Sequence, residues 1–164
     1  MIYLFKVIRL KKIIKFILII LCMLLIFSFS SDTATESSKK SDGTIVKVSE
    51  MLIGRKLTTK EKKYLVGTYT VIVRKSAHFI LYFILGLLIY SFLLEYSFTN
   101  KQIIMITITI VLLYSISDEV HQMFIKGRSG EVRDVFIDTI AGSLACFSYY
   151  ILRRKLNGQE KTIS

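Results

Sequence analysis

Residues 74–94 read RKSAHFILYFILGLLIYSFLL, and this stretch decides the fold. Its two strongly basic residues, Arg74 and Lys75, stand at the start, and apolar and aromatic residues fill most of the remaining positions. A run of about 18 or more apolar residues is long enough to cross the hydrocarbon core of a bilayer as a helix. The sequence therefore predicts a membrane-spanning helix over residues 77–94, with His78 near its start.

Three further apolar runs accompany this span, over residues 13–29, 103–117 and 135–152. The run at 103–117 is short, so its helix should continue through residues 118–122. The chain has 164 residues, is 52% hydrophobic and contains no proline. This composition is too apolar for a soluble domain, which must cover its core with polar surface. We therefore expect an all-α integral membrane protein, a four-transmembrane-helix bundle with an extracytoplasmic surface segment between its first two helices.

The first apolar run, residues 13–29, allows two interpretations. Basic residues precede it and the small Ser28 and Ser30 lie at its end, a pattern that also fits a secretory signal peptide cleaved after Ser30. Because three further spans follow, we favour a retained helix. Residues 1–30 then form a basic segment joined to the first span.

The segment between the first two spans, residues 31–75, is polar and is expected to lie outside the cytoplasm. Residues 30–43 are rich in serine and mixed charges, which is typical of a flexible, solvated stretch. Beyond it, Ile45, Val48 and Leu52 recur at helical spacing. That pattern predicts a short amphipathic helix lying on the membrane surface.

A capping box marks the next helix start, because Thr58 is followed three residues later by Glu61. A helix beginning near residue 59 could continue directly into the second span. The remaining chain divides into a three-helix core over residues 76–152 and a basic tail over residues 153–164.

Basic residues at both ends of the chain predict its orientation. Those before the first span are Lys6, Arg9, Lys11, Lys12 and Lys15, and those after the last are Arg153, Arg154 and Lys155. Since cytoplasmic flanks carry an excess of Lys and Arg, both termini are expected in the cytoplasm, which requires an even number of spans. Arg74 and Lys75 run against this bias, because a four-span topology places them outside.

The net charge of +11 raises the question of a nucleic-acid partner. The basic residues flank apolar runs, which indicates anchoring at an anionic lipid surface. No zinc finger, recognition helix or aromatic RNA-binding signature is visible, so no nucleic acid is expected. Cys22 and Cys146 fall inside apolar runs and are expected to be small buried residues and not disulfide partners.

Antiparallel spans bring alternate helix ends together, so the polar groups at three such ends should meet at one membrane face. They are Arg74, Lys75 and His78; then Asp118, Glu119, His121 and Gln122; and finally Arg128, Arg133, Asp134 and Asp138. A charge at the bilayer centre costs roughly 2.5–3.5 kcal/mol on insertion scales, so such groups are generally paired and face inward. A purely structural ion-pair network is the alternative, but this density of groups, with two histidines, favours a functional site.

Two kinds of role are predicted within this cluster. Candidates for acid–base chemistry are His78, Asp118, Glu119 and His121, because a histidine changes charge near neutral pH. Candidates for ligand binding are Lys75, Gln122, Arg128, Asp134 and Asp138. The cations favour an anionic ligand such as a lipid phosphate or a carboxylate. Histidine and carboxylate donors also suit zinc, but HExxH and CxxC spacings are missing and nearby Lys and Arg oppose a cation, so neither a metal nor a cofactor is expected.

These residues carry a resemblance to the VanZ-like family of bacterial membrane proteins. The resembling positions are Arg74-Lys75-Ser76-Ala77-His78-Phe79, Tyr82 and Gly86; Ser117-Asp118-Glu119-Val120-His121-Gln122-Met123-Phe124 and Gly127-Arg128; and Asp134, Asp138 and Gly142. The resemblance covers about residues 27–152. The family also tends to show Phe-Ser-Ser-Gln after the first span, where this chain has Phe29-Ser30-Ser31-Asp32.

The resemblance implies a role in the envelope of a bacterial cell, in the plasma membrane, and the founding member is associated with low-level resistance to the glycopeptide teicoplanin. Our leading hypothesis is a protein that binds or modifies an anionic lipid-linked envelope component at its outer face. Whether it is an enzyme stays open. One alternative is a non-catalytic module that uses small residues over 141–145 to dock a partner membrane protein or a second copy. The other is a proton-coupled transporter in which His78 and Asp138 relay protons.

Overall fold

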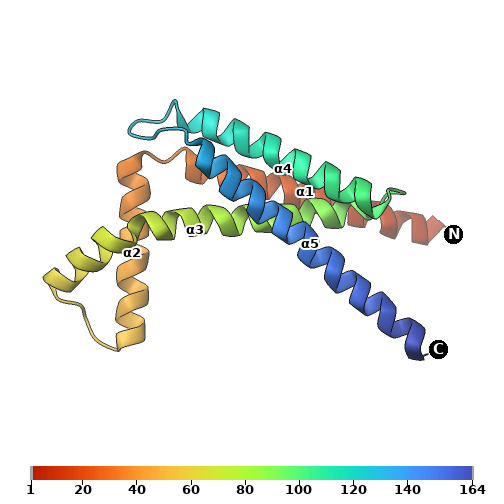
Figure 1. The fold of residues 1–164 in the computed structure, drawn as a ribbon, viewed down its shortest axis with the longest axis horizontal. Coiled ribbons are helices and arrows are strands. Elements are labelled where there is room, and N and C mark those ends of the chain that lie inside the picture. The colour runs from red at the N-terminus through yellow and green to blue at the C-terminus, as the bar shows by residue number, and fades with distance from the viewer. Residues whose placement is uncertain (1, 164) are drawn as a thin grey trace.

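The computed structural model describes the backbone of residues 2–163 and the side chains of residue 7 and residues 9–156. The helices are α1 (Ile2–Ser30), α2 (Ala34–Ile53), α3 (Thr59–Leu93), α4 (Asn100–Gln122) and α5 (Val132–Ile163), and this part of the chain contains no strand (Figure 1). Four helices are long and apolar enough to cross a membrane, over Arg9–Ser30, Thr59–Leu93, Asn100–Gln122 and Val132–Leu156. The all-α, four-span prediction is confirmed.

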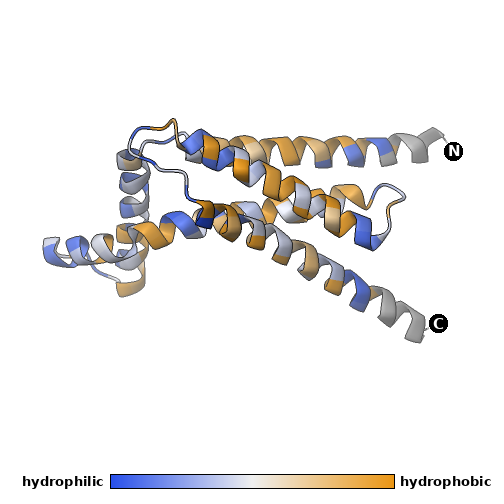
Figure 2. Ribbon diagram, turned by 45° about the horizontal axis from the view of Figure 1, so that its top comes forward, coloured by the Kyte–Doolittle hydropathy of each residue, from blue (hydrophilic) through white to orange (hydrophobic). Residues whose placement is uncertain are grey.

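The four long helices run alongside one another, and both chain ends lie at the same end of the bundle (Figure 1). The remaining helix, α2, lies crosswise at the opposite end, against the first half of α3. This arrangement brings together the end of α1, the end of α4 and the start of α5. The polar residues of those three helix ends therefore gather at the end of the bundle that α2 crosses, as Figure 2 shows in blue.

Helix α3 is the centre of the bundle, because it contacts every other helix and packs most extensively on α5. Its inward side carries Tyr82 and Leu85, both fully buried. At the crossing of α3 and α5, a Cβ on Gly86 would lie 2.6 Å from the carbonyl oxygen of Gly142. Only glycine allows the two backbones to approach so closely. The small residues of the last span are thus used inside this chain.

The side chains of Cys22 and Cys146 are buried and form no disulfide, as predicted for small apolar residues. Large apolar side chains such as Leu113 and Ile140 point out of the bundle and are more than half exposed. In water such a surface would be unfavourable, whereas in a bilayer it is solvated by lipid.

The prediction of a flexible stretch over residues 30–43 is wrong, because α2 begins at residue 34 and runs through it. A capping box starts this helix: the Thr33 hydroxyl accepts a hydrogen bond from the backbone of Glu36, and the Glu36 side chain accepts from the backbone of Thr33. Ser37, Ser41 and Ile45 recur at every fourth position and form the buried side of α2. Serine is small enough to let α2 lie close to α3, so a composition typical of disorder here serves helix packing.

Helix α3 begins at Thr59, as the capping box of Thr58 and Glu61 predicted, and continues unbroken to Leu93. Its 35 residues correspond to a length of about 52 Å, whereas a hydrocarbon core is about 30 Å thick. The first half of α3 therefore extends beyond the bundle, where it packs against α2. One link between the two is a hydrogen bond of 2.5 Å from the Thr70 hydroxyl to the Asp42 carboxylate.

Candidate functional site

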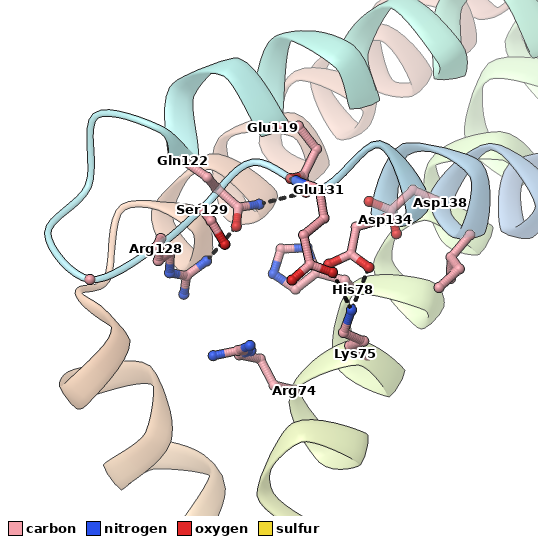
Figure 3. Close-up of a pocket in the computed structure, with 12 residues that line it drawn as sticks. Arg74, Lys75, His78, Glu119, Gln122, Arg128, Ser129, Glu131, Asp134 and Asp138 are labelled. Carbon is pink, nitrogen blue, oxygen red and sulfur yellow. Dashed lines mark hydrogen bonds and ion pairs between the residues drawn. The ribbon is translucent and has the colours of Figure 1, made fainter.

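A polar pocket lies where α3, α4 and α5 meet beneath the loop of residues 123–131 (Figure 3). It contains about 610 Å³ of empty space, including its open mouth. Its lining residues are Arg74, Lys75, His78, Glu119, Gln122, Gly127, Arg128, Ser129, Glu131, Asp134, Ile137 and Asp138. The pocket lies at the end of α4 and the start of α5, beside the middle of α3.

One side of the pocket is an ion-pair cluster centred on Lys75. Its ammonium lies 2.5 Å from the carboxylate of Asp134 and 3.4 Å from that of Glu131. The guanidinium of Arg133 lies 3.2 Å from Glu131 but is largely exposed and does not line the pocket. Lys75 is thus neutralised by neighbouring carboxylates and joins α3 to the start of α5.

The Glu119 side chain holds the loop in place from below. It is buried, and its carboxylate accepts a hydrogen bond of 2.8 Å from the backbone N–H of Glu131 and one of 3.0 Å from the Gln122 amide. A buried carboxylate keeps its place only when its oxygens have such partners. Glu119 therefore acts as a fixed support for the pocket wall.

Two glycines allow the loop to fold over the pocket. Gly127 has φ of +78°, a left-handed conformation that side chains disfavour. A Cβ on Gly130 would lie 2.7 Å from the Met123 side chain and 2.9 Å from the carbonyl oxygen of Glu119. The loop accordingly reverses direction and passes directly over the end of α4, which places Arg128 and Glu131 at the pocket.

The other side of the pocket carries two guanidinium groups. Arg128 donates hydrogen bonds to the Gln122 side-chain oxygen at 3.1 Å and to the Phe29 carbonyl at 3.0 Å. Its Nε atom is buried without a hydrogen-bond partner. Burial lowers the pKa of Arg128 from its usual value, and the positive charge of Arg74 adds to this effect. Among the residues that the structure describes, neither arginine forms an ion pair with a carboxylate.

His78 lines the pocket between these two sides, and Asp138 lines it beyond Asp134 (Figure 3). Asp138 is buried and His78 is partly buried. Within residues 9–156, neither side chain forms an ion pair with a neighbour. Both therefore keep their polar atoms available to a molecule in the pocket.

Asp118 and His121 lie outside this pocket and face α1. The Ser30 hydroxyl donates a hydrogen bond of 2.8 Å to Asp118, and the Ser31 hydroxyl lies 3.1 Å from Nε2 of His121. The His121 ring also stacks on Phe27, with 4.3 Å between ring centroids. Gln122 connects the two regions, because its amide donates to both Asp118 and Glu119.

Most of the predicted site residues are thus brought together, namely Lys75, His78, Glu119, Gln122, Arg128, Asp134 and Asp138, whereas Asp118 and His121 fasten α4 to α1. The pocket also includes Ser129 and Glu131, which the sequence pattern did not indicate, and Arg74, which was expected in the cluster but without a role. The nearest signal for the first two was the pair Gly127 and Gly130, because Ser129 lies between these glycines and Glu131 directly follows the second. Across the described residues, no group of three or more His, Cys, Asp or Glu side chains is arranged to hold a metal ion.

The residues Phe29-Ser30-Ser31-Asp32 at the end of the first span include Asp32, the one departure from the family pattern noted above. Ser30 and Ser31 bind α4, and the Phe29 carbonyl binds Arg128. Asp32, which stands where the family tends to have glutamine, forms an ion pair of 2.6 Å with Lys40 on α2. The carboxylate therefore fixes the start of α2 and does not line the pocket.

Comparison with known proteins agrees with this architecture. The family model described as VanZ/LLP1 matches residues 15–153, which include every residue of the pocket, the two middle spans and most of the first and last spans. Searches of the curated proteins and of the solved structures gave no match. Since the family match covers most of its length, this chain belongs to the VanZ/LLP1 family.

Proposed function

We propose that this protein acts in the bacterial cell envelope, where its polar pocket binds the phosphate of an anionic lipid-linked component and thereby lowers susceptibility to glycopeptides such as teicoplanin. The observation that carries the proposal is the pair of guanidinium groups of Arg74 and Arg128, which have no carboxylate partner among the described residues. Two cations that face the same space repel each other until an anion joins them. A phosphate suits them because arginine binds phosphate oxygens in a bidentate manner.

We infer that a membrane lipid reaches the site from the bilayer. It lies beside α3, at the end of α4 and the start of α5, which a four-span topology puts near the phospholipid headgroups. Exposed apolar side chains lie close in sequence to the lining residues of the pocket, among them Phe124, Val132 and Phe136. An amphiphile could therefore place its phosphate in the pocket while its chains stay in the bilayer.

The orientation of the chain decides which leaflet supplies the ligand. The Lys- and Arg-rich termini lie together at the end of the bundle remote from the pocket (Figure 1). The positive-inside rule places such termini in the cytoplasm. The pocket then opens at the outer face of the plasma membrane.

Modification of the ligand would require a proton donor or acceptor in the pocket. His78 and Asp138 are the residues placed for this, since Glu119 is already bound to the Glu131 backbone. Histidine is a suitable general acid or base near neutral pH. Binding without turnover is the alternative, and a His78→Gln variant that still protects the host from glycopeptides would favour it.

The proposal is tested by teicoplanin susceptibility of a host that expresses wild-type protein, Arg74→Gln or Arg128→Gln at matched membrane levels. We expect both variants to lose protection, and the phosphate-containing lipids that copurify with wild-type protein to be depleted from them. Arg133→Gln is the matched control, because its arginine is nearby and exposed but does not line the pocket. Full protection by both pocket variants would refute the proposal. His121→Gln should retain protection, because His121 packs on α1.

A further inference from the structure

The turn between α2 and α3, with its flanking helix ends, is a second lipid-facing feature of the molecule. We call residues 47–63 the elbow. Within it, the last three residues of α2 are exposed and apolar: Met51, Leu52 and Ile53. The first two are 77% and 78% exposed, more than most apolar side chains of the spans themselves. Figure 2 shows this hydrophobic end of α2 at a distance from the apolar bundle. No described residue covers it, so it needs a partner other than water.

The elbow holds these side chains in a fixed conformation. Gly54 ends α2 in a left-handed conformation with φ of +73°, and the capping box of Thr58 begins α3. Between them, the buried Leu57 donates its backbone N–H to the Glu50 carboxylate at 3.1 Å. Lys56 and Lys62 form ion pairs with the same carboxylate. The exposed apolar residues are therefore presented by an ordered turn.

The charge of the elbow is strongly positive. It contains six Lys or Arg residues and two glutamates, Glu50 and Glu61. Both glutamates are already paired within the elbow, the second with Arg55 at 2.6 Å. Lys47, Arg55 and Lys56 surround an open hollow beside Met51. Cations around an apolar side chain are the combination by which surface helices bind anionic bilayers.

The position of α2 identifies the bilayer as the occupant. Helix α2 starts only a few residues after the first span ends, and its first backbone N–H donates to the carbonyl of Lys126 in the pocket loop at 3.3 Å. Its start is thus fixed at the membrane surface. Since it runs crosswise to the spans for 20 residues, its far end lies about 30 Å to the side. That distance carries the elbow out over the surrounding lipid.

We propose that the elbow is a membrane anchor, which inserts Met51, Leu52 and Ile53 into the leaflet on the pocket side and binds anionic phospholipid headgroups with its lysines and arginine. This inference uses no pocket residue, so it stands or falls independently of the proposed function. The lipid headgroups at the elbow hold α2 down beside the pocket mouth.

The chain contains no tryptophan, so a single introduced tryptophan reports its own depth. The full-length protein is reconstituted in vesicles of phosphatidylcholine alone, or mixed equally with phosphatidylglycerol, with brominated acyl chains as the quencher. Leu52→Trp measures the depth of the elbow. Leu113→Trp is the control for a tryptophan within the bilayer, because Leu113 is exposed on the outside of the bundle. Tyr64→Trp, exposed on the part of α3 that extends beyond the bundle, is the solvated control.

We expect quenching of Leu52→Trp to approach that of Leu113→Trp and to exceed that of Tyr64→Trp several-fold. Quenching of Leu52→Trp by aqueous iodide, with none by brominated lipid, overturns the proposal. Protection from both quenchers also overturns it, because a protein contact would then cover the elbow.

The role of charge is tested in the same protein by adding Lys47→Gln, Lys60→Gln and Lys63→Gln, none of which removes an ion pair found in the described residues. We expect phosphatidylglycerol to increase lipid quenching in Leu52→Trp, and the three added changes to abolish that increase. Equal quenching in both kinds of vesicle, with and without the three changes, overturns the anionic headgroup contact.

Discussion

The hydroxyl of Ser30 at the end of α1 donates a hydrogen bond of 2.8 Å to the buried carboxylate of Asp118 on α4, 88 residues further along the chain. The same carboxylate accepts a bond of 3.2 Å from Gln122, which also binds Glu119 and Arg128. The contact therefore connects the first span to the wall of the pocket.

Replacement of this serine should weaken the bundle. In Ser30→Ala the Asp118 carboxylate loses a donor while it stays buried, which costs about 1–3 kcal/mol. Thermal unfolding of the purified protein in detergent measures the loss. Ser28→Ala is the control, because Ser28 is exposed two residues earlier on the same helix. Equal stability of the two variants would mean that the contact contributes nothing.

The glycine contact between α3 and α5 predicts that alanine destabilises the protein at one glycine of α3 and stabilises it at another. Gly86→Ala brings a Cβ to 2.6 Å from a backbone oxygen of Gly142, and such overpacking costs about 1–3 kcal/mol. Gly67→Ala on the same helix meets nothing within 4 Å and should stabilise the helix by about 0.5–1 kcal/mol. Unfolding in detergent measures both. A neutral Gly86→Ala would contradict the close approach.

Loss of the Glu119 carboxylate should loosen the pocket loop without unfolding the spans. In Glu119→Gln one acceptor oxygen and the negative charge are lost. The side chain can then no longer accept hydrogen bonds on separate oxygens from both the Glu131 backbone and the Gln122 amide. The bond to a charged group contributes about 1.5–3 kcal/mol, so hydrogen exchange over residues 127–131 should accelerate at least tenfold. Exchange in the spans should be unchanged. Ser129→Ala, an exposed change in the same loop, serves as the control.

The elbow should lose stability in acid. The ammonium of Lys56, then the Leu57 backbone N–H, lower the pKa of Glu50 to about 2, from its usual value of about 4.5. Because the folded pKa is the lower one, the stabilisation is complete above about pH 4.5 and is lost as the pH falls toward 2. Protection of the Leu57 amide from hydrogen exchange, corrected for the intrinsic rate, should fall in this range. In Glu50→Gln the protection should be low throughout and independent of pH.

The architecture was predictable because its main determinant is local. Long apolar runs with few charges indicate spans, and Thr58 with Glu61 marks a helix start through neighbouring residues alone. The prediction for residues 30–43 was wrong because a serine-rich composition indicates only how the segment alone would interact with water. Against α3, Ser37 and Ser41 become a close-packed surface, and only tertiary contact reveals this.

The location of the site was predictable from the sequence, but which of its polar residues line the pocket and which contact α1 was not. Antiparallel spans force the polar helix ends together, which is why His78, Glu119 and Asp138 meet. A helical rotation of one residue is about 100°, however, and it decides that Glu119 faces the pocket while Asp118 faces α1. Arg74 and Lys75 differ in the same way, since only the second has carboxylate neighbours.

Arg74, Lys75 and His78 lie near the middle of α3, which runs without interruption from the elbow to the far end of the bundle. No proline interrupts this helix, so its two halves are joined by continuous backbone hydrogen bonds and one half cannot tilt without bending the other. With the elbow anchored in the leaflet as proposed, thinning or curvature of that leaflet would tilt α3 and displace one wall of the pocket. The shape of the pocket would then depend on the thickness and tension of the bilayer.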